Sequence, residues 1–175
     1  MMQIFELLGK KSTSIVLRYF LEHPSEETYA TQLGKKLKIA RKSLFDALAV
    51  LQKSQLIELR MAGRTKEYRL KRDSALVRQL KILNSIANLL PMLESLEGSG
   101  AEVYLYGSAA RGEDTEKSDT DLLFIGERPE GRLLDKIEAE EKIKPIFLTF
   151  LEYSSLARKD KPFYERIEKD RIRLI

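Results

Sequence analysis

The sequence has no cysteine and only one histidine, His23, among its 175 residues. Without cysteine the chain forms neither a disulfide nor a thiolate metal site, and a single histidine is too few for an imidazole cluster. Any metal that this chain binds would therefore have oxygen ligands, which points to Mg²⁺ or Mn²⁺.

Long apolar runs are missing as well. No stretch reaches the roughly 18 apolar residues of a membrane-spanning helix, and the first residues, MMQIFELLGKKS, lack the apolar segment of a signal peptide. We therefore expect a soluble, cytoplasmic protein with no membrane partner. Hydrophobic residues make up 43% of the chain, which is enough for a packed core and argues against global disorder.

The net charge of +4 is unevenly distributed along the chain. Residues 1–72 hold 15 Lys and Arg against 7 Asp and Glu, a net charge of +8, whereas residues 73–175 hold 16 against 20, a net charge of −4. A basic first half suggests a polyanionic partner in that half, although a lysine-rich surface that contacts only water would have the same composition.

Apolar periodicity predicts three helices in the first half, over residues 12–22, 28–37 and 41–53. Two short strands then follow over residues 56–60 and 65–70, joined by a turn that contains Gly63. One local feature is unfavourable: Ala40 precedes the third helix where a Ser or Thr N-cap is expected, which costs about 1 kcal/mol of helix stability.

Three helices followed by a hairpin resemble the winged helix-turn-helix domain of many prokaryotic transcription regulators, over about residues 10–72. The resemblance rests on the spacing of a set of apolar residues: Leu33, Leu37, Ile39, Leu44, Leu48, Leu51, Leu56 and Ile57. It implies double-stranded DNA as a partner. The alternative is a winged helix used only for protein contacts or dimerisation.

Two groups of residues would contact DNA in such a domain. The start of the third helix would face base edges in the major groove, with Arg41, Lys42 and Ser43. The hairpin would reach phosphates with Arg60, Arg64, Lys66 and Arg69.

Residues 73–97 are predicted to form a helix with two adjacent apolar stripes. One stripe consists of Leu76, Leu80, Leu83, Ala87 and Leu90, and the other of Ile82, Ile86, Leu89, Leu93 and Leu96. Pro91 is expected to kink or divide the helix. Residues 73–90 would then be a connector or a dimerisation helix, and residues 91–97 a core helix of the second domain. The apolar stripes exceed what one small domain needs, so we predict a homodimer.

The second half contains a G-S … D-x-D motif. A strand over residues 101–106 ends at Gly107-Ser108, a helical turn and a polar loop follow, and a second strand over residues 118–125 carries Asp119 and Asp121. Carboxylates two residues apart on a strand project from the same face and repel each other unless a cation lies between them. A divalent ion that also binds triphosphate oxygens meets that need.

The remaining motif residues suit an anionic ligand. Gly107 lets the backbone approach a phosphate closely, and Ser108 at a helix start adds a hydroxyl and N–H donors. Arg111 would either neutralise a phosphate or cover the surface. In the last segment, a helix over residues 163–169 and a strand over 172–175 are expected. Arg166, Lys169 and Arg171 either face a phosphate or, as the favoured alternative, lie on a solvated helix face.

The motif is similar to that of the nucleotidyltransferase superfamily that includes DNA polymerase beta, in the minimal form found in short prokaryotic domains, some of which act as antitoxins. The resemblance covers residues 91–175. It implies a small α/β domain with a mixed sheet, in which Asp119 and Asp121 are catalytic metal ligands and Gly107, Ser108 and Arg111 bind the nucleotide.

One feature departs from the family pattern. Active members carry a third acidic residue on the next strand, which is expected here at residues 143–150, IKPIFLTF, and this segment has no Asp or Glu. Glu140 and Glu141 precede it and Glu152 follows it. The missing acid puts catalysis in doubt but leaves nucleotide and metal binding possible.

The predicted architecture is α+β: a winged helix-turn-helix domain at residues 1–72, a connecting helix at 73–90, and a minimal nucleotidyltransferase-like domain at 91–175. One hypothesis is an enzyme that transfers a nucleotidyl group from a nucleoside triphosphate to a hydroxyl. A second is a DNA-binding regulator whose degenerate second domain senses a nucleotide or dimerises. A third is an antitoxin-like pairing with a toxin-type protein partner.

Overall fold

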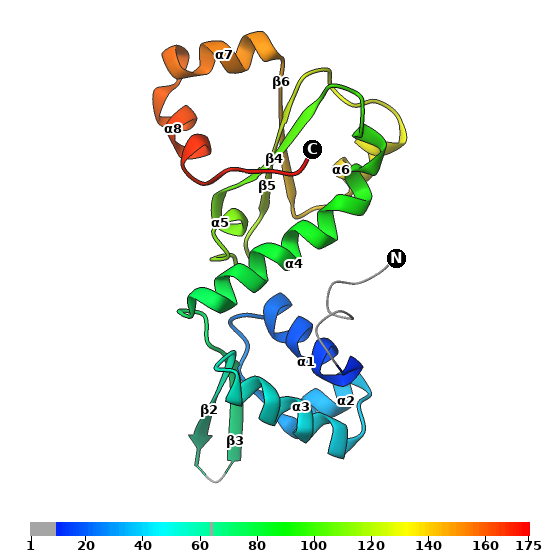
Figure 1. Ribbon diagram of the computed structural model, residues 1–175, viewed down its shortest axis with the longest axis vertical. Helices are drawn as coiled ribbons and strands as arrows, with labels where there is room; N and C mark the ends of the chain where they lie inside the picture. The colour runs from blue at the N-terminus through cyan, green and yellow to red at the C-terminus, as the bar shows by residue number, and fades with distance from the viewer. Residues whose placement is uncertain (1–9, 64) are drawn as a thin grey trace. The chain divides into compact units, whose positions relative to one another are not determined.

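The computed structural model describes residues 10–63 and 65–175, which divide into two compact units, Met1–Asn84 and Ser85–Ile175 (Figure 1). The division falls inside residues 73–90, the segment expected to connect two domains; the domain limits themselves stay a prediction. Helices and a mixed sheet together confirm the α+β class. Within the described part of the chain, no helix is both long and apolar enough to cross a membrane.

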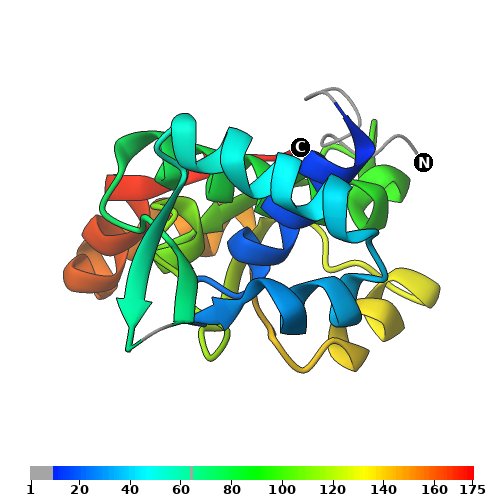
Figure 2. The same ribbon diagram turned by 90° about the horizontal axis from the view of Figure 1, so that it is seen from below.

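The first unit combines three helices with a small antiparallel sheet. The helices are α1 (Lys11–Glu22), α2 (Ala30–Leu37) and α3 (Arg41–Lys53), and the strands are β1 (Thr28–Tyr29), β2 (Ile57–Ala62) and β3 (Thr65–Leu70). The sheet has the order β1-β3-β2. The β2–β3 hairpin lies at one end of the three helices in both views (Figures 1 and 2).

In the first unit, two predicted boundaries differ from the observed ones by two residues. Residues 28–29 were expected in a helix but form β1, in which Thr28 pairs with Tyr68 and Tyr29 with Glu67. A β-branched and an aromatic residue favour a strand, and the pairing gives their backbone groups partners on β3. The hairpin is also longer than expected, because Met61 and Ala62 continue β2.

Large apolar side chains fill the core of the first unit. Phe20, Leu33, Leu48, Leu51 and Ile57 are almost completely buried. The helix α3 starts at Arg41 without a side-chain cap, because Ala40 has no side-chain acceptor. The packing of Leu44, Leu48 and Leu51 therefore holds the helix in place instead of a cap.

The helix α4 (Ala75–Leu93) continues through Pro91 and is followed by a 3₁₀ turn, η2 (Glu94–Leu96). Pro91 was expected to kink or divide the helix; it does not divide it, and the kink stays a prediction. Pro91 lies in the last turn, where its missing N–H removes a single helical hydrogen bond near an end that is already open. Val77 of α4 packs in the core of the first unit, and Leu89 and Leu93 pack in that of the second.

The second unit is built on a four-stranded mixed sheet with the order β6-β5-β4-β7. Its strands are β4 (Glu102–Tyr106), β5 (Thr120–Ile125), β6 (Ile143–Leu148) and β7 (Ile172–Arg173). The pairs β4–β5 and β4–β7 are antiparallel and β5–β6 is parallel. The helices are α5 (Gly107–Ala110), α6 (Arg132–Ala139), α7 (Phe150–Lys159) and α8 (Lys161–Asp170).

Helices cover both faces of this sheet (Figure 1). On one face, Leu122 and Phe124 of β5 pack in a cluster with residues of α4 and α6. On the other face, Leu123 and Ile125 pack with residues of α7 and α8. The alternation along β5 therefore places Asp121 on the face that α7 and α8 cover.

Candidate functional site

The site is built where β4 ends beside the start of β5. Tyr106 is the last residue of β4 and is the cross-strand partner of Asp121. The chain then turns into α5 at Gly107, whose φ is +73°. A Cβ added to Gly107 would overlap Oδ2 of Asp121 and lie 3.3 Å from its Cγ. Glycine is therefore required at this position for two reasons: the backbone conformation and the close approach of the Asp121 carboxylate.

Asp119 was expected inside the second strand, but β5 begins at Thr120, two residues later than predicted, so Asp119 lies just before the strand. A polar turn leads into it: Ser118 Oγ accepts a hydrogen bond from the Thr115 N–H at 2.9 Å, and the Ser118 N–H donates to the Thr115 carbonyl at 3.0 Å. Thr120, between the two aspartates, donates its N–H to the Lys142 carbonyl at 2.7 Å. These bonds fix the backbone on both sides of Asp119, whose side chain is exposed.

Burial raises the pKa of Asp121 above its ordinary value of 3.8. Arg166 and, more weakly, Arg111 act in the opposite direction, while the charge of Asp119 raises the pKa further. Burial and the neighbouring carboxylate together outweigh the two arginines. A cation bound between the aspartates would favour the ionised form of both.

The two arginines near Asp121 differ in their partners. Arg111 donates from Nε to Glu113 Oε2 at 2.8 Å and from Nη1 to Asp170 Oδ2 at 2.9 Å, so it joins α5 to the end of α8. Arg166 is exposed, with its Cζ 5.0 Å from the ring centroid of Phe163. Among the residues that the structure describes, no carboxylate forms an ion pair with Arg166. Of these two cations, Arg166 is thus the freer to contact an anion at Asp121.

Arg171 was expected on a solvated face, and this expectation is wrong. Its Nη1 donates to the Tyr153 hydroxyl at 2.7 Å, its Nε lies 3.0 Å from Glu168 Oε1, and its Cζ lies 4.5 Å from the ring centroid of Tyr104. The Tyr153 hydroxyl also donates to Glu168, and burial followed by this bond raises the pKa of Tyr153. The cluster ties α7 and α8 to β4, which fixes the helix that carries Arg166.

A lysine stands beside Asp121 on the neighbouring strand. In the parallel β5–β6 pair, Asp121 is in register with Lys144. Ile146 lies two residues after Lys144 and packs in the same cluster as Leu123, two residues after Asp121. Since side chains alternate along a strand, Lys144 and Asp121 share one face of the sheet. The ammonium group donates to the Glu141 carbonyl at 3.1 Å.

As far as the structure describes the chain, none of the flanking glutamates forms a three-carboxylate metal group with Asp119 and Asp121. Glu152 accepts hydrogen bonds from the N–H and the hydroxyl of Thr149, both at 2.8 Å, in the capping box of α7. Glu152 comes after the end of β6 at which Leu148 pairs with Ile125. Asp121 lies at the other end of the β5–β6 pair. Glu140 and Glu141 precede β6, and their side chains are exposed.

The donor set at the site is therefore two carboxylates. In the described part of the chain, no group of three or more His, Asp or Glu residues is arranged to hold a metal ion. Mg²⁺ requires about six oxygen ligands and usually keeps several waters. Asp119 and Asp121 thus fit a cation whose remaining ligands come from phosphate and water rather than from the protein.

Of the three predicted DNA-contacting residues of α3, two are exposed and one is half-buried. Arg41 and Lys42 are exposed, and Ser43 is half-buried. The Arg41 Cζ lies 5.8 Å from the ring centroid of Phe45, which is itself 42% exposed. The first five residues of α3 therefore present two cations and one aromatic ring.

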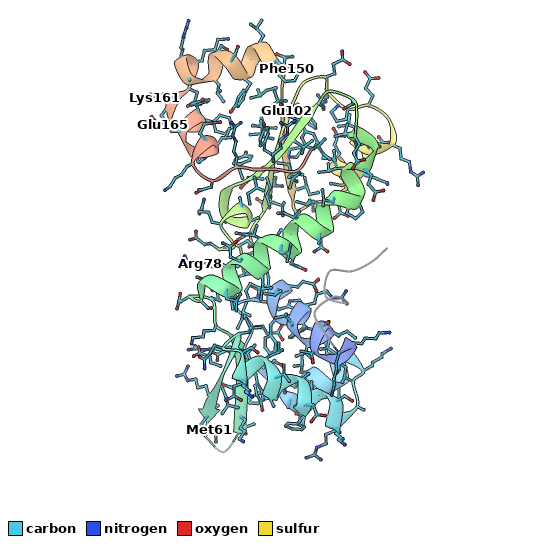
Figure 3. The ribbon with its side chains drawn as sticks, in the orientation of Figure 1. Met61, Arg78, Glu102, Phe150, Lys161 and Glu165 are labelled. Atoms are coloured by element: carbon cyan, nitrogen blue, oxygen red, sulfur yellow. The ribbon has the colours of Figure 1, made fainter. Side chains whose placement is uncertain are left out.

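The hairpin cations divide into paired and unpaired residues. Arg69 Nε lies 2.6 Å from Glu58 Oε1, and Glu27 Oε1 lies 3.3 Å from Arg69 and 4.0 Å from Arg60. Lys66 is exposed and forms no ion pair with a described residue. Met61 lies near the tip of the hairpin (Figure 3). Arg64 lies outside the described residues.

Comparison with known proteins identifies the second half of the chain. Residues 86–175, just over half of the sequence, match the family model for the nucleotidyltransferase domain. Among solved structures, the chain is similar to a candidate nucleotidyltransferase from Sulfolobus solfataricus, with 20% identity, a TM-score of 0.35, and coverage of 58% of this chain and 88% of that one. It is also similar to the protein AF1382 from Archaeoglobus fulgidus, with 18% identity, a TM-score of 0.33, and coverage of 54% and 96%. No functionally curated protein matches the sequence significantly.

Proposed function

The chain belongs to the nucleotidyltransferase domain family, and we propose that its second unit binds a nucleoside triphosphate together with Mg²⁺ or Mn²⁺ at Asp119 and Asp121. The observation that carries this proposal is the close approach of the Gly107 backbone to the Asp121 carboxylate. It supports a site in which the N–H donors of the turn after β4 bind phosphate oxygens beside a carboxylate-bound cation.

Four residues around the aspartates have distinct proposed roles. Gly107 gives the phosphate access to the backbone, and Ser108 adds its hydroxyl. Arg166 contacts a phosphate directly, because no described carboxylate occupies it. Arg111 contributes its charge at longer range, since its donors are used by Glu113 and Asp170.

A second candidate function is nucleotidyl transfer to a hydroxyl, which family membership and the retained aspartate pair support. In such a reaction the hydroxyl oxygen attacks the α-phosphorus, pyrophosphate leaves, and the hydroxyl proton passes to a base. The resemblance implies that base on the strand that is β6 here, where Lys144 is the residue in register with Asp121, and an ammonium ion accepts no proton. We infer that binding and sensing a nucleotide dominate, and that transfer is slow or absent unless a partner or substrate supplies the base.

Calorimetric titration of the full chain with ATP and GTP, with and without Mg²⁺, tests the binding proposal. We expect heat of binding that depends on the divalent ion and that disappears in the double variant Asp119→Asn with Asp121→Asn. The matched control is Glu140→Gln with Glu141→Gln, which removes two neighbouring carboxylates in the same unit and should bind as wild type does. Equal binding by the aspartate variant and wild type would disprove the site.

We further propose that the first unit is a winged helix-turn-helix domain that binds double-stranded DNA. Three helices followed by the β2–β3 hairpin support this fold, and the net charge of +8 over residues 1–72 supports a polyanionic partner. Arg41, Lys42 and Ser43 at the start of α3 would face base edges. Lys66 would contact phosphate most directly, because Arg60 and Arg69 lie close to glutamates.

Salt-dependent DNA binding by the full chain tests this second proposal. Lys66→Ala should weaken binding to all duplexes alike and reduce the slope of log affinity against log salt by about one. Lys42→Ala should instead change the preference among sequences. A chain that binds no duplex even at low salt would remove the proposal.

We also propose a homodimer through α4. Leu76, Leu83 and Leu90 are spaced seven residues apart and are 55%, 38% and 38% exposed, a repeat typical of helices that pack against a second helix. Light scattering at high micromolar concentration should give twice the chain mass, and Leu83→Glu should give the monomer mass. A toxin-type protein partner stays a prediction that no observation favours.

A further inference from the structure

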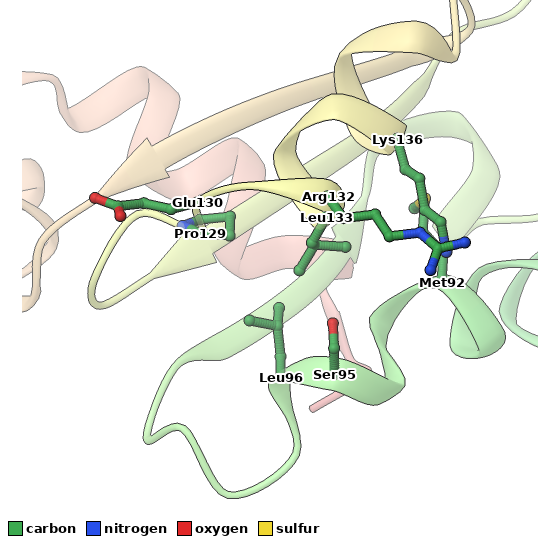
Figure 4. Close-up of a pocket in the computed structure, with 8 residues that line it drawn as sticks. All are labelled: Met92, Ser95, Leu96, Pro129, Glu130, Arg132, Leu133 and Lys136. Carbon is green, nitrogen blue, oxygen red and sulfur yellow. The ribbon is translucent and has the colours of Figure 1, made fainter.

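A pocket of about 450 Å³ lies in the second unit between the end of α4 with η2 and the first turns of α6 (Figure 4). Leu96 and Leu133 line it and belong to the hydrophobic cluster that contains Leu122 and Phe124. Asp121 lies on the opposite face of the sheet, beside the cluster of Leu123. The pocket is therefore separate from the aspartate pair.

The interior of the pocket is mostly apolar. Its walls include Met92, Leu96, Pro129 and Leu133. Leu96 and Leu133 are 8% and 9% exposed, so they present little more than their tips. A volume of this size lies within the range of sites for small molecules, and such walls favour an apolar ligand body.

Two cations line the same pocket. Arg132 and Lys136 stand one helical turn apart on α6, both exposed. In Figure 4, Arg132 extends toward Met92 and Lys136, whereas the Glu130 carboxylate points away from them. Within residues 10–63 and 65–175, neither cation forms an ion pair. By contrast, the nearby Arg128 is paired with Glu138 at 3.3 Å.

We propose that this pocket binds a small amphipathic anion, with a carboxylate or phosphate head group held by Arg132 and Lys136 and a short apolar body held against Leu96 and Leu133. Like charges one turn apart on a helix repel each other, and a bound anion removes that repulsion. Glu130, which points away, does not neutralise the two cations. The binding is independent of the nucleotide, because the two sites lie on opposite faces of the sheet.

The probe is 1-anilinonaphthalene-8-sulfonate, an aromatic anion whose fluorescence rises in apolar surroundings, titrated into the full chain. Octanoate and octyl phosphate should displace it, and their relative strength tells which head group the pocket prefers. Octanol and octylammonium, with the same apolar body and no negative charge, should displace it poorly. Equal displacement by octanol and octanoate would overturn the proposed role of the cations.

Two variants test the location of the site. Arg132→Gln with Lys136→Gln should weaken probe and octanoate binding about tenfold, as expected for the loss of charged hydrogen bonds. Ser95→Phe should fill the pocket and remove binding without changing any charge. The matched control, Lys142→Gln with Arg158→Gln, removes one lysine and one arginine elsewhere in the unit and should bind as wild type does.

Circular dichroism shows whether each variant is folded. If the α6 double variant fails to fold, Ser95→Phe decides the question by itself. Wild-type binding by folded Ser95→Phe overturns the proposal and assigns the probe to exposed apolar residues such as Phe150 and Leu151, which are 54% and 79% exposed. The double variant Asp119→Asn with Asp121→Asn should bind the probe normally, so failure of the nucleotide proposal and failure of this one are distinguishable.

Discussion

The backbone of Gly107 lies against the carboxylate of Asp121, so close that a methyl group on Gly107 would overlap Oδ2. The two residues come from different strand ends, and their contact holds a chain turn beside a half-buried negative charge. A phosphate reaching the N–H groups of that turn therefore has to pass close to Asp121. A cation between the carboxylate and the phosphate removes their repulsion.

Gly107→Ala should damage the site more than it damages the fold. A non-glycine residue at a φ of +73° costs about 1–2 kcal/mol, and its Cβ would also displace the Asp121 side chain. We expect a loss of stability of about that size and a loss of Mg²⁺-dependent triphosphate binding, measured by denaturant unfolding and calorimetry.

Gly100→Ala is the matched control for this change. Gly100 has a φ of +78°, and a Cβ added there would meet nothing within 4 Å. It should lose stability through its backbone conformation and keep triphosphate binding. Equal loss of binding in both variants would show that the contact between Gly107 and Asp121 has no special role.

Asp121 should make the fold less stable at neutral pH than an uncharged residue would. Because its pKa is raised in the folded chain, the folded protein holds the proton more tightly than the unfolded chain does, and ionisation costs stability. That cost is present above the raised pKa and disappears as the pH falls below the ordinary value of 3.8. Asp121→Asn should therefore raise Tm by a few degrees at most at neutral pH, and the gain should vanish as the pH falls below 3.8.

Nucleotide binding should depend on pH in the opposite direction. A divalent cation needs the ionised carboxylate, so Mg²⁺-dependent triphosphate binding should weaken as the pH falls through the raised pKa of Asp121. Calorimetry for Tm and for binding over the same pH series measures both effects. Glu140→Gln, which removes an exposed carboxylate, should change neither; a Tm increase of equal size in that variant would contradict the prediction.

Lys144→Glu should strengthen the cation site. The change places a carboxylate in register with Asp121 on the same face of the sheet, which adds a ligand for the divalent ion and a base for an acceptor hydroxyl. We expect tighter Mg²⁺-dependent triphosphate binding and, where an acceptor is present, faster release of pyrophosphate. Lys142→Glu makes the same change of charge just before β6 and should have neither effect. Identical gains in the two variants would show that the effect comes from net charge alone and not from a carboxylate beside Asp121.

The sequence predicted the parts of the site that lie close together along the chain. Gly107, Ser108, Asp119 and Asp121 belong to one motif, and the structure pairs Tyr106, which precedes Gly107, with Asp121. Joint action of the two carboxylates stays a prediction. The start of α3 at Arg41 and the span of β3 were also predicted correctly, because helix periodicity and strand alternation are local properties.

The features that the sequence did not predict depend on register and tertiary contact. Nothing in the order of residues says that Lys144 pairs with Asp121, since one residue of slip in β6 would turn the lysine to the other face. The short strand β1 exists only because β3 offers it a partner. The sequence alone places Arg171 at the surface, but the return of α8 and β7 to β4 half-buries it beside the rings of Tyr104 and Tyr153.

Arg166 lies on α8, so its place near Asp121 also depends on the return of α8 to the sheet. The variant Arg166→Gln tests its proposed contact with phosphate. The charge of Arg166 lowers the pKa of Asp121, and no described carboxylate competes for its donors. Removing it should weaken triphosphate binding about tenfold, the loss expected for one charge-assisted hydrogen bond, and should raise the pKa of Asp121 further. Arg158→Gln, on an exposed part of α7, is the matched control. A changed Tm with a triphosphate affinity equal to that of wild type would show that Arg166 does not contact the phosphate.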